Sequence, residues 1–265
     1  MAKVDAISNV GIFVTNQKRA RDFYTKKLGL KVVGGMPEWG YLELAVRKGG
    51  KDAVLNLWTP KAWGLSAKEA KKKVGVTTGI GLGVDNFEGT VASLKKKGVK
   101  VDVWHGEGYH MATVHDPDGN GLFLAAETKK SKKKPGITRL DWVTISSRNA
   151  KRSGAFFQKT LGMKKAGGDE WAAYSASPGG TALMPFTPKK SNYENASDYK
   201  ADLAAIGEDT AIMLRTSDAK GLEKQLKKKG VKFESPMEEQ DWGGVSANIF
   251  DPDGNKYMLF QPRKR

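Results

Sequence analysis

The stretch Asp116-Pro117-Asp118-Gly119-Asn120 returns, letter for letter, at residues 251–255. Pro after Asp presets φ for the first turn position, and Gly and Asn tolerate positive φ, so the stretch predicts a tight turn between antiparallel strands. Residues 94–100 return in the same way at 226–232, and Leu28-Gly29 returns as Leu161-Gly162. Because these landmarks keep their order at offsets of 132 to 135 residues, they predict a duplicated domain.

The composition fits a two-domain globular protein. The chain has 265 residues, of which 39% are hydrophobic, and no apolar run is long enough to span a bilayer. The first residues lack the apolar core of a signal peptide, and the absence of cysteine excludes disulfides and thiolate metal sites. We therefore expect a cytoplasmic protein without a membrane partner.

The net charge of +16 and the pI of 9.7 raise the alternative of a nucleic-acid surface. The lysines fall, however, on the polar faces and C-terminal ends of predicted helices, where the helix dipole favours them. No basic strand studded with aromatic residues, typical of single-strand binders, is present. We interpret the charge as solvated helix surface and expect no nucleic-acid partner.

Hydrophobic periodicity predicts four βαβββ units in two pairs. The predicted strands are 6–14, 31–35, 39–47, 52–59, 79–84, 100–104, 109–115 and 121–126, then 137–146, 164–167, 171–176, 181–187, 210–216, 231–234, 244–250 and 256–261. The predicted helices are 17–28, 87–97, 150–161 and 218–229, and long insertions occupy 60–76 and 188–208. We place an N-terminal domain at 1–128, a basic linker at 129–136 and a C-terminal domain at 137–265.

The chain resembles the vicinal oxygen chelate superfamily, which includes glyoxalase I, the extradiol dioxygenases and the bleomycin-resistance proteins. Phe23-Tyr24 followed by Leu28-Gly29, and the two Asp-Pro-Asp-Gly-Asn turns, carry this resemblance over nearly the whole chain. It implies an α+β fold of tandem glyoxalase-like domains, each with two βαβββ units that form a curved mixed-sheet cup with helices outside. It also implies a monomer with pseudo-twofold domains or a homodimer. The fold hosts lyases, dioxygenases and non-catalytic binders.

Metal-binding members of this superfamily carry His or Glu on the first and fourth strands of a unit. Here the eight corresponding positions hold Asn9, Asn56, Gly79, Phe123, Trp142, Met184, Ala211 and Met258. None is a His, Asp or Glu, the side chains that hold a catalytic divalent ion, so we expect no metal and no cofactor. Of the three histidines, His110 and His115 should face opposite sides of one strand, which argues against a shared metal.

We expect the aliphatic sides of the strands to pack under the helices and the other sides to line the cups. The predicted ligand-binding residues of the N-terminal cup are Asn9, Phe13, Tyr41, Asn56, Trp58, Trp63, Thr113, His115 and Phe123. Trp58 and Phe123 would stack on a planar ligand, Trp63 would act as a lid, and glycines on the strand 79–84 would leave volume. The alternative is that the aromatic residues are core and that the buried Asn side chains satisfy backbone groups.

These residues favour a metal-free, bleomycin-resistance-like protein that binds a small, planar or aromatic organic molecule. The alternative is an enzyme of the lyase or dioxygenase type. It would use a metal in a different strand register, or acid-base chemistry by Glu43 and His115 if their side chains meet.

Overall fold

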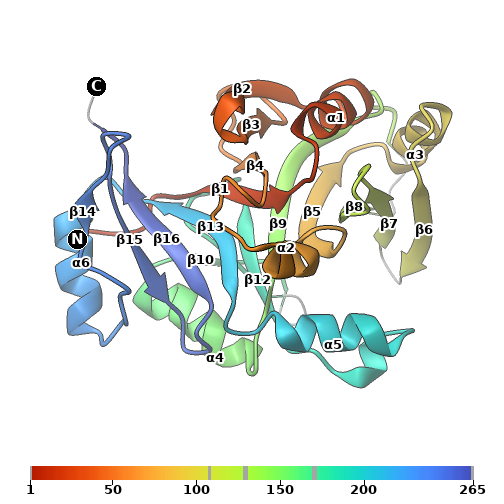
Figure 1. Cartoon of the computed structure of the whole chain (residues 1–265). Coiled ribbons are helices and arrows are strands. Elements are labelled where there is room, and N and C mark those ends of the chain that lie inside the picture. Colours follow the sequence, from red (N-terminus) through yellow and green to blue (C-terminus); the bar gives the residue numbers. More distant parts are fainter. Residues whose placement is uncertain (1, 107–108, 128–130, 169–171, 264–265) are drawn as a thin grey trace. The chain divides into compact units, whose positions relative to one another are not determined.

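The structure is a computed structural model that describes residues 2–106, 109–127, 131–168 and 172–263 (Figure 1). Residues 129 and 130 of the predicted linker, and residue 171 of a predicted strand, lie outside the described residues. Within the described part of the chain, no helix is long and apolar enough to cross a membrane.

The chain divides into two compact units. One comprises residues 10–142, and the other comprises residues 1–9 with 143–265. The boundaries fall inside strands β1 (Ala6–Phe13) and β9 (Ile137–Ser146). The start of each of these strands therefore belongs to a different compact unit from the residues that follow it.

In the unit of residues 10–142, strand β1 leads directly into helix α1 (Figure 1). The elements after β1 are α1 (Gln17–Asp22), η1 (Phe23–Lys27), β2 (Lys31–Met36), η2 (Pro37–Trp39), β3 (Tyr41–Ala45), β4 (Val54–Trp58), α2 (Ala67–Lys73), β5 (Thr77–Val84), α3 (Phe87–Lys96), β6 (Val101–Gly106), β7 (Tyr109–His115) and β8 (Gly121–Glu127). Strands β2, β3 and β4 are antiparallel neighbours. Strand β5 runs parallel to β8, which continues antiparallel to β7 and β6.

The other unit repeats this plan. Its elements after β9 are α4 (Ala150–Ala155), η3 (Phe156–Thr160), β10 (Lys164–Ala166), β11 (Ala173–Ser175), β12 (Ala182–Phe186), η4 (Lys190–Asn192), α5 (Ala196–Ala204), β13 (Asp209–Arg215), α6 (Ala219–Lys228), β14 (Glu238–Glu239), β15 (Val245–Phe250) and β16 (Lys256–Gln261). The strand predicted at 231–234 is wrong. A single bridge, Phe233 to Ile249, takes its place, and Pro236, which lacks an N–H, interrupts the pairing before β14.

Two eight-stranded mixed sheets confirm the expected α+β fold. Their strand orders are β14-β15-β16-β13-β1-β4-β3-β2 and β10-β11-β12-β9-β5-β8-β7-β6. Strands β1 to β4 and β5 to β8 thus belong to different sheets, so the expectation that the first two βαβββ units line one cup is wrong. The reason lies at the start of β1, where the Asp5 N–H donates to Arg215 O at 2.7 Å and Ser8 Oγ to Met213 O at 3.1 Å.

The predicted aliphatic core is confirmed on both sets of strands in the unit of residues 10–142. On β3, β4 and β5 the almost completely buried aliphatic side chains include Leu42, Leu44, Leu55, Leu57, Ile80, Leu82 and Val84. Helix α1 packs against β3 and β4, and α3 against β6 and β8. Each fully buried aliphatic side chain stabilises the fold by about 1.5–3 kcal/mol. The aliphatic face of each strand is therefore fixed in the core, and only the opposite face can form a site.

The predicted turns form, and each also holds the start of a helix. In the first, the Gly119 N–H donates to Asp116 O at 3.0 Å, and Asn120 Nδ2 donates to Phe13 O at 3.0 Å. Asp118 accepts from the Thr15 N–H at 3.0 Å and pairs with Arg19 of α1. The turn between β7 and β8 therefore also fixes the end of β1.

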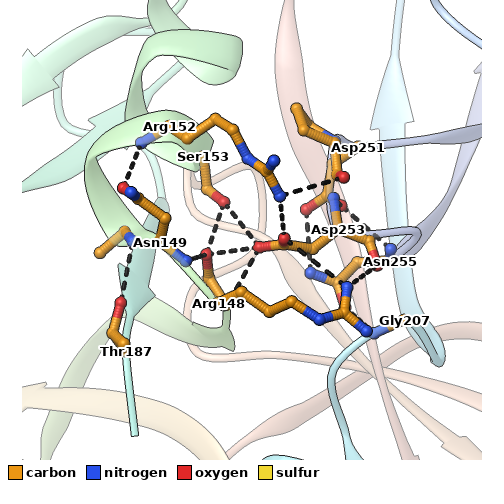
Figure 2. Close-up of polar contacts among 12 residues, drawn as sticks. Arg148, Asn149, Arg152, Ser153, Thr187, Gly207, Asp251, Asp253 and Asn255 are labelled. Atoms are coloured by element: carbon orange, nitrogen blue, oxygen red, sulfur yellow. Dashed lines mark hydrogen bonds and ion pairs between the residues drawn. The ribbon is translucent and has the colours of Figure 1, made fainter.

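The second copy of the turn also binds a strand end and a helix start (Figure 2). Asp253 accepts from Ser147 Oγ at 2.6 Å and from the Arg148 N–H at 3.0 Å, and it pairs with Arg152 of α4. Asn255 accepts from the Gly207 N–H at 2.7 Å and donates through Nδ2 to Ser146 O at 3.1 Å. In both copies, the side chains of the Asp-Pro-Asp-Gly-Asn turn bind the end of a strand and the start of a helix. The repeated sequence therefore reflects a repeated contact.

Candidate functional site

One face of β3 and β4 carries aromatic and polar side chains, in contrast to the leucines on the other face. In the strand register, Tyr41 lies opposite Trp58 and Glu43 opposite Asn56. Since side chains alternate along a strand, these four point to the same side of the sheet. With two further aromatic residues they form what we call the aromatic cluster: Phe13, Tyr41, Glu43, Asn56, Trp58 and Trp63.

The rings of the aromatic cluster contact one another in a chain. Tyr41 stacks on Trp58 with ring centroids 4.2 Å apart and planes at 24°. Trp58 meets Trp63 edge-on at 4.8 Å, and Trp63 meets Phe13 edge-on at 5.7 Å. Such offset and edge-to-face pairs contribute about 0.5–1.5 kcal/mol each beyond the area that they bury.

Trp63 reaches the cluster from the insertion that follows β4. Backbone hydrogen bonds shape this turn, among them the bond from the Trp63 N–H to Thr59 O at 3.3 Å and the bond from the Leu65 N–H to Pro60 O at 2.9 Å. Trp63 therefore belongs to a turn outside the strand ladder, and it can move without breaking pairs between strands. Tyr41 and Trp58, in contrast, are fixed by the sheet.

The aromatic cluster also contains polar groups. Tyr41 donates its hydroxyl hydrogen to Glu43 Oε1, and burial, followed by this bond and the charge of Glu43, raises the pKa of Tyr41 well above its usual range. The side chain of Asn56 is completely buried. The indole Nε1–H of Trp58 is also buried and has no hydrogen-bond partner among the described residues. An unsatisfied buried donor costs about 1–3 kcal/mol, so this N–H is suited to a bound acceptor.

The predicted residues Thr113, His115 and Phe123 do not join the aromatic cluster. They lie on β7 and β8 in the other sheet. His115 Nε2 lies 2.9 Å from Asp102 Oδ2, whereas Glu43 accepts from Tyr41. The acid-base pair proposed between Glu43 and His115 is therefore not formed, because the two strands that carry them belong to different sheets.

His110 lies on the opposite face of β7 from His115, as the sequence predicts. Its ring stacks on Phe87 of α3 at 5.3 Å, and its Nε2 lies 3.6 Å from Glu88 Oε1. This position under a helix is a packing position rather than a site.

The glycine face of β5 does not leave open volume. A Cβ atom at Gly81 would overlap the indole ring of Trp142, and one at Gly83 would overlap Asp141 and approach Arg139. The expectation that glycines on this strand make room for a ligand is thus wrong. These positions lack side chains because β9, which sequence reasoning did not place beside β5, fills the space with its own.

Two residues were missed by the sequence analysis although a signal existed. Asp102 and Trp104 lie opposite Thr113 and Met111 in the hairpin of β6 and β7. Trp104 contacts the ring of Phe123 at 6.4 Å, and Asp102 binds His115. Counting outward from the hairpin turn would have placed both residues on the same face as His115.

The side chains present do not fit a catalytic divalent metal of the kind expected from the resemblance to the vicinal oxygen chelate superfamily. Asn9 and Asn56 are buried amides, and Trp142 and Phe123 present aromatic rings where such a site needs His, Asp or Glu. Among the residues that the structure describes, no three His, Asp or Glu side chains are grouped so that they could hold a metal ion.

Several solved structures are similar to this chain. Glyoxalase I from Zea mays has 20% sequence identity and a TM-score of 0.67, with 98% of this chain and 92% of that chain covered. A putative dioxygenase from Bacillus subtilis has 15% identity and a TM-score of 0.64, with coverage of 100% and 87%. An antibiotic binding protein from Streptomyces sp. has 25% identity over 46% of this chain and 95% of that chain, with a TM-score of 0.37. The comparison with curated proteins gave no match.

The family comparison covers both halves of the sequence. The profile of the Glyoxalase/Bleomycin resistance protein/Dioxygenase superfamily matches residues 6–123 and again residues 139–259. The two matches coincide with the two copies of the turn motif and with the two sets of βαβββ units. The chain therefore belongs to the glyoxalase/bleomycin resistance protein/dioxygenase superfamily.

Proposed function

We propose that this protein binds a small, planar organic molecule at the aromatic cluster. The observation that carries the proposal is the buried Trp58 indole N–H without a partner among the described residues, set between the rings of Tyr41 and Trp63. A planar ligand with an acceptor atom would stack on these rings and satisfy this donor. Asn56, fully buried on the same face, supplies a further polar side chain that fixes orientation.

The route of entry follows from which rings can move. Trp63 meets Trp58 edge-on and belongs to the turn after β4, so it can be displaced without breaking the pairing between strands. A planar ligand would take the place of Trp63 against Trp58, with Trp63 closing over it. The lyase or dioxygenase alternative has no comparable support, because Glu43 and His115 bind different partners.

Equilibrium titration of tryptophan fluorescence with planar aromatic compounds tests the proposal. Trp58→Phe keeps a ring but removes the N–H, and we expect affinity to fall about fivefold to tenfold, the effect of losing one hydrogen bond of about 1 kcal/mol. Trp63→Ala should weaken binding further by removing the covering ring. Trp242→Phe is the matched control, since Trp242 is 52% exposed and belongs to the other compact unit. Equal affinities in all three variants, or no binding to the wild type, would overturn the proposal.

A further inference from the structure

We infer that the ligand of the aromatic cluster is an organic cation, such as a planar ring with a quaternary nitrogen or an aromatic amine that is protonated. This inference rests on the proposed function and adds the charge of the ligand to it. Its basis is the carboxylate of Glu43 within a set of aromatic rings.

The position of Glu43 is built into the strand register. Glu43 lies opposite Asn56 on β4 and opposite Gly34 on β2. A Cβ atom at Gly34 would overlap Glu43 Oε2, so the glycine makes the room in which the carboxylate lies. Tyr41 donates to the other oxygen, Oε1. The carboxylate thus lies on the same face as the rings, bonded to Tyr41 of its own strand and in the space that Gly34 leaves.

The chemistry of these groups favours positive charge. An ionised carboxylate only accepts hydrogen bonds, so any group that meets it favourably must donate a hydrogen or carry positive charge. The faces of Trp and Tyr rings are the negative ends of their quadrupoles and attract cations within about 6 Å of the ring centroid. Tyr41 and Trp58 stack, and Trp63 stands at 69° to Trp58, so ring faces of different orientation lie on the side of the sheet to which Glu43 points.

The net charge of the chain and the charge of the aromatic cluster favour ligands of opposite sign. A protein of charge +16 would favour an acidic ligand if long-range charge decided its specificity. At physiological ionic strength, however, charges more than about 8 Å apart are largely screened, so neighbouring groups decide. An acidic ligand at the aromatic cluster would be repelled by the carboxylate of Glu43 and by the negative faces of the rings.

Three ring systems of nearly equal shape test this charge preference: N-methylacridinium, acridine and acridine carboxylate, at a pH where acridine is neutral. Titrations of the wild type should give at least about tenfold tighter binding of N-methylacridinium than of acridine, and the weakest binding for the carboxylate. Glu43→Gln should remove the preference for N-methylacridinium over acridine. Glu38→Gln makes the same change in net charge at an exposed position and should keep the preference.

The outcomes separate the inference from the proposed function. If acridine binds the wild type as tightly as N-methylacridinium, or if Glu43→Gln keeps the preference, the cation inference is overturned. The proposed function then survives as long as binding still weakens in Trp58→Phe. If none of the three compounds binds, both are overturned. The comparison within the wild type decides the matter even if Glu43→Gln does not fold.

Discussion

Replacement of Asp253 by Asn tests whether the repeated turn stabilises the fold by docking a carboxylate. The Asp253 side chain has no exposed surface and accepts from Ser147 Oγ at 2.6 Å, from the Arg148 N–H at 3.0 Å and from Arg152. Breaking a buried ion pair costs about 3–5 kcal/mol. Because Arg152 and Arg148 are 51% and 64% exposed and can turn to water, we expect the lower end, about 3 kcal/mol.

Urea unfolding of wild type and variant, followed by circular dichroism, measures this loss as the change in unfolding free energy. Asp118→Asn is the matched control in the first turn, where the carboxylate is 3% exposed and binds one arginine, Arg19, with Thr15. We expect its cost to be lower, about 2 kcal/mol, because fewer charge-assisted bonds are lost. A cost below about 1 kcal/mol for Asp253→Asn, or a larger cost for Asp118→Asn, would refute the reasoning.

The effect of Asp253→Asn should depend on pH in a defined direction. Burial alone would raise the pKa of Asp253, but bonds from Ser147, Arg152 and the Arg148 backbone outweigh it and hold the pKa below its usual range. A folded-state pKa below the unfolded value of about 3.9 means that the contribution to stability is fully present above that value. It is lost as pH falls through the folded pKa. The difference in unfolding free energy between wild type and variant should therefore stay constant above about pH 4 and shrink as the pH falls further. A difference that does not change below about pH 4 would contradict this prediction.

Two further predictions concern the backbone and packing. Gly81→Ala would place a Cβ inside the Trp142 ring, so we expect a loss of about 2–3 kcal/mol in unfolding free energy. Gly168→Ala should change the unfolding free energy by less than about 0.5 kcal/mol, because no heavy atom of the described residues lies within 4 Å of the added carbon. Equal effects of these two variants would show that Trp142 does not fill this face. Ala211 has φ of 54° at the bulge of β13, so Ala211→Gly should relieve left-handed strain and raise the unfolding free energy by about 0.5 kcal/mol; a drop in the midpoint of thermal unfolding would contradict this.

Local structure and the faces of the strands could be predicted because they depend on short-range patterns. The leucines at positions 42, 44, 55 and 57 alternate with polar and aromatic residues, and burial of the leucine face determines the register in which β3 and β4 pair. That register alone brings Tyr41 beside Trp58 and Glu43 beside Asn56. The part of the candidate site that lies within one βαβββ unit was therefore visible in the sequence.

Which βαβββ units share a sheet could not be predicted in the same way. All four βαβββ units show the same alternation of apolar and polar residues. This pattern therefore does not indicate whether the strands of the first βαβββ unit share a sheet with those of the second or with those of the fourth. The decision is made by contacts far apart in sequence, such as Ser8 with Met213. The filling of the Gly81 face by Trp142 and the separation of His115 from Glu43 both follow from that choice.

The most direct test of the proposed site is the nuclear magnetic resonance spectrum of the tryptophan indole N–H groups during titration with a planar ligand. The chain has seven tryptophans, so the peaks can be resolved, and Trp58→Phe assigns the one of interest by its loss. The account predicts that the Trp58 N–H peak moves downfield as it gains an acceptor, while the Trp242 peak stays in place. Saturable binding that leaves the Trp58 peak unmoved and shifts other indoles would contradict it.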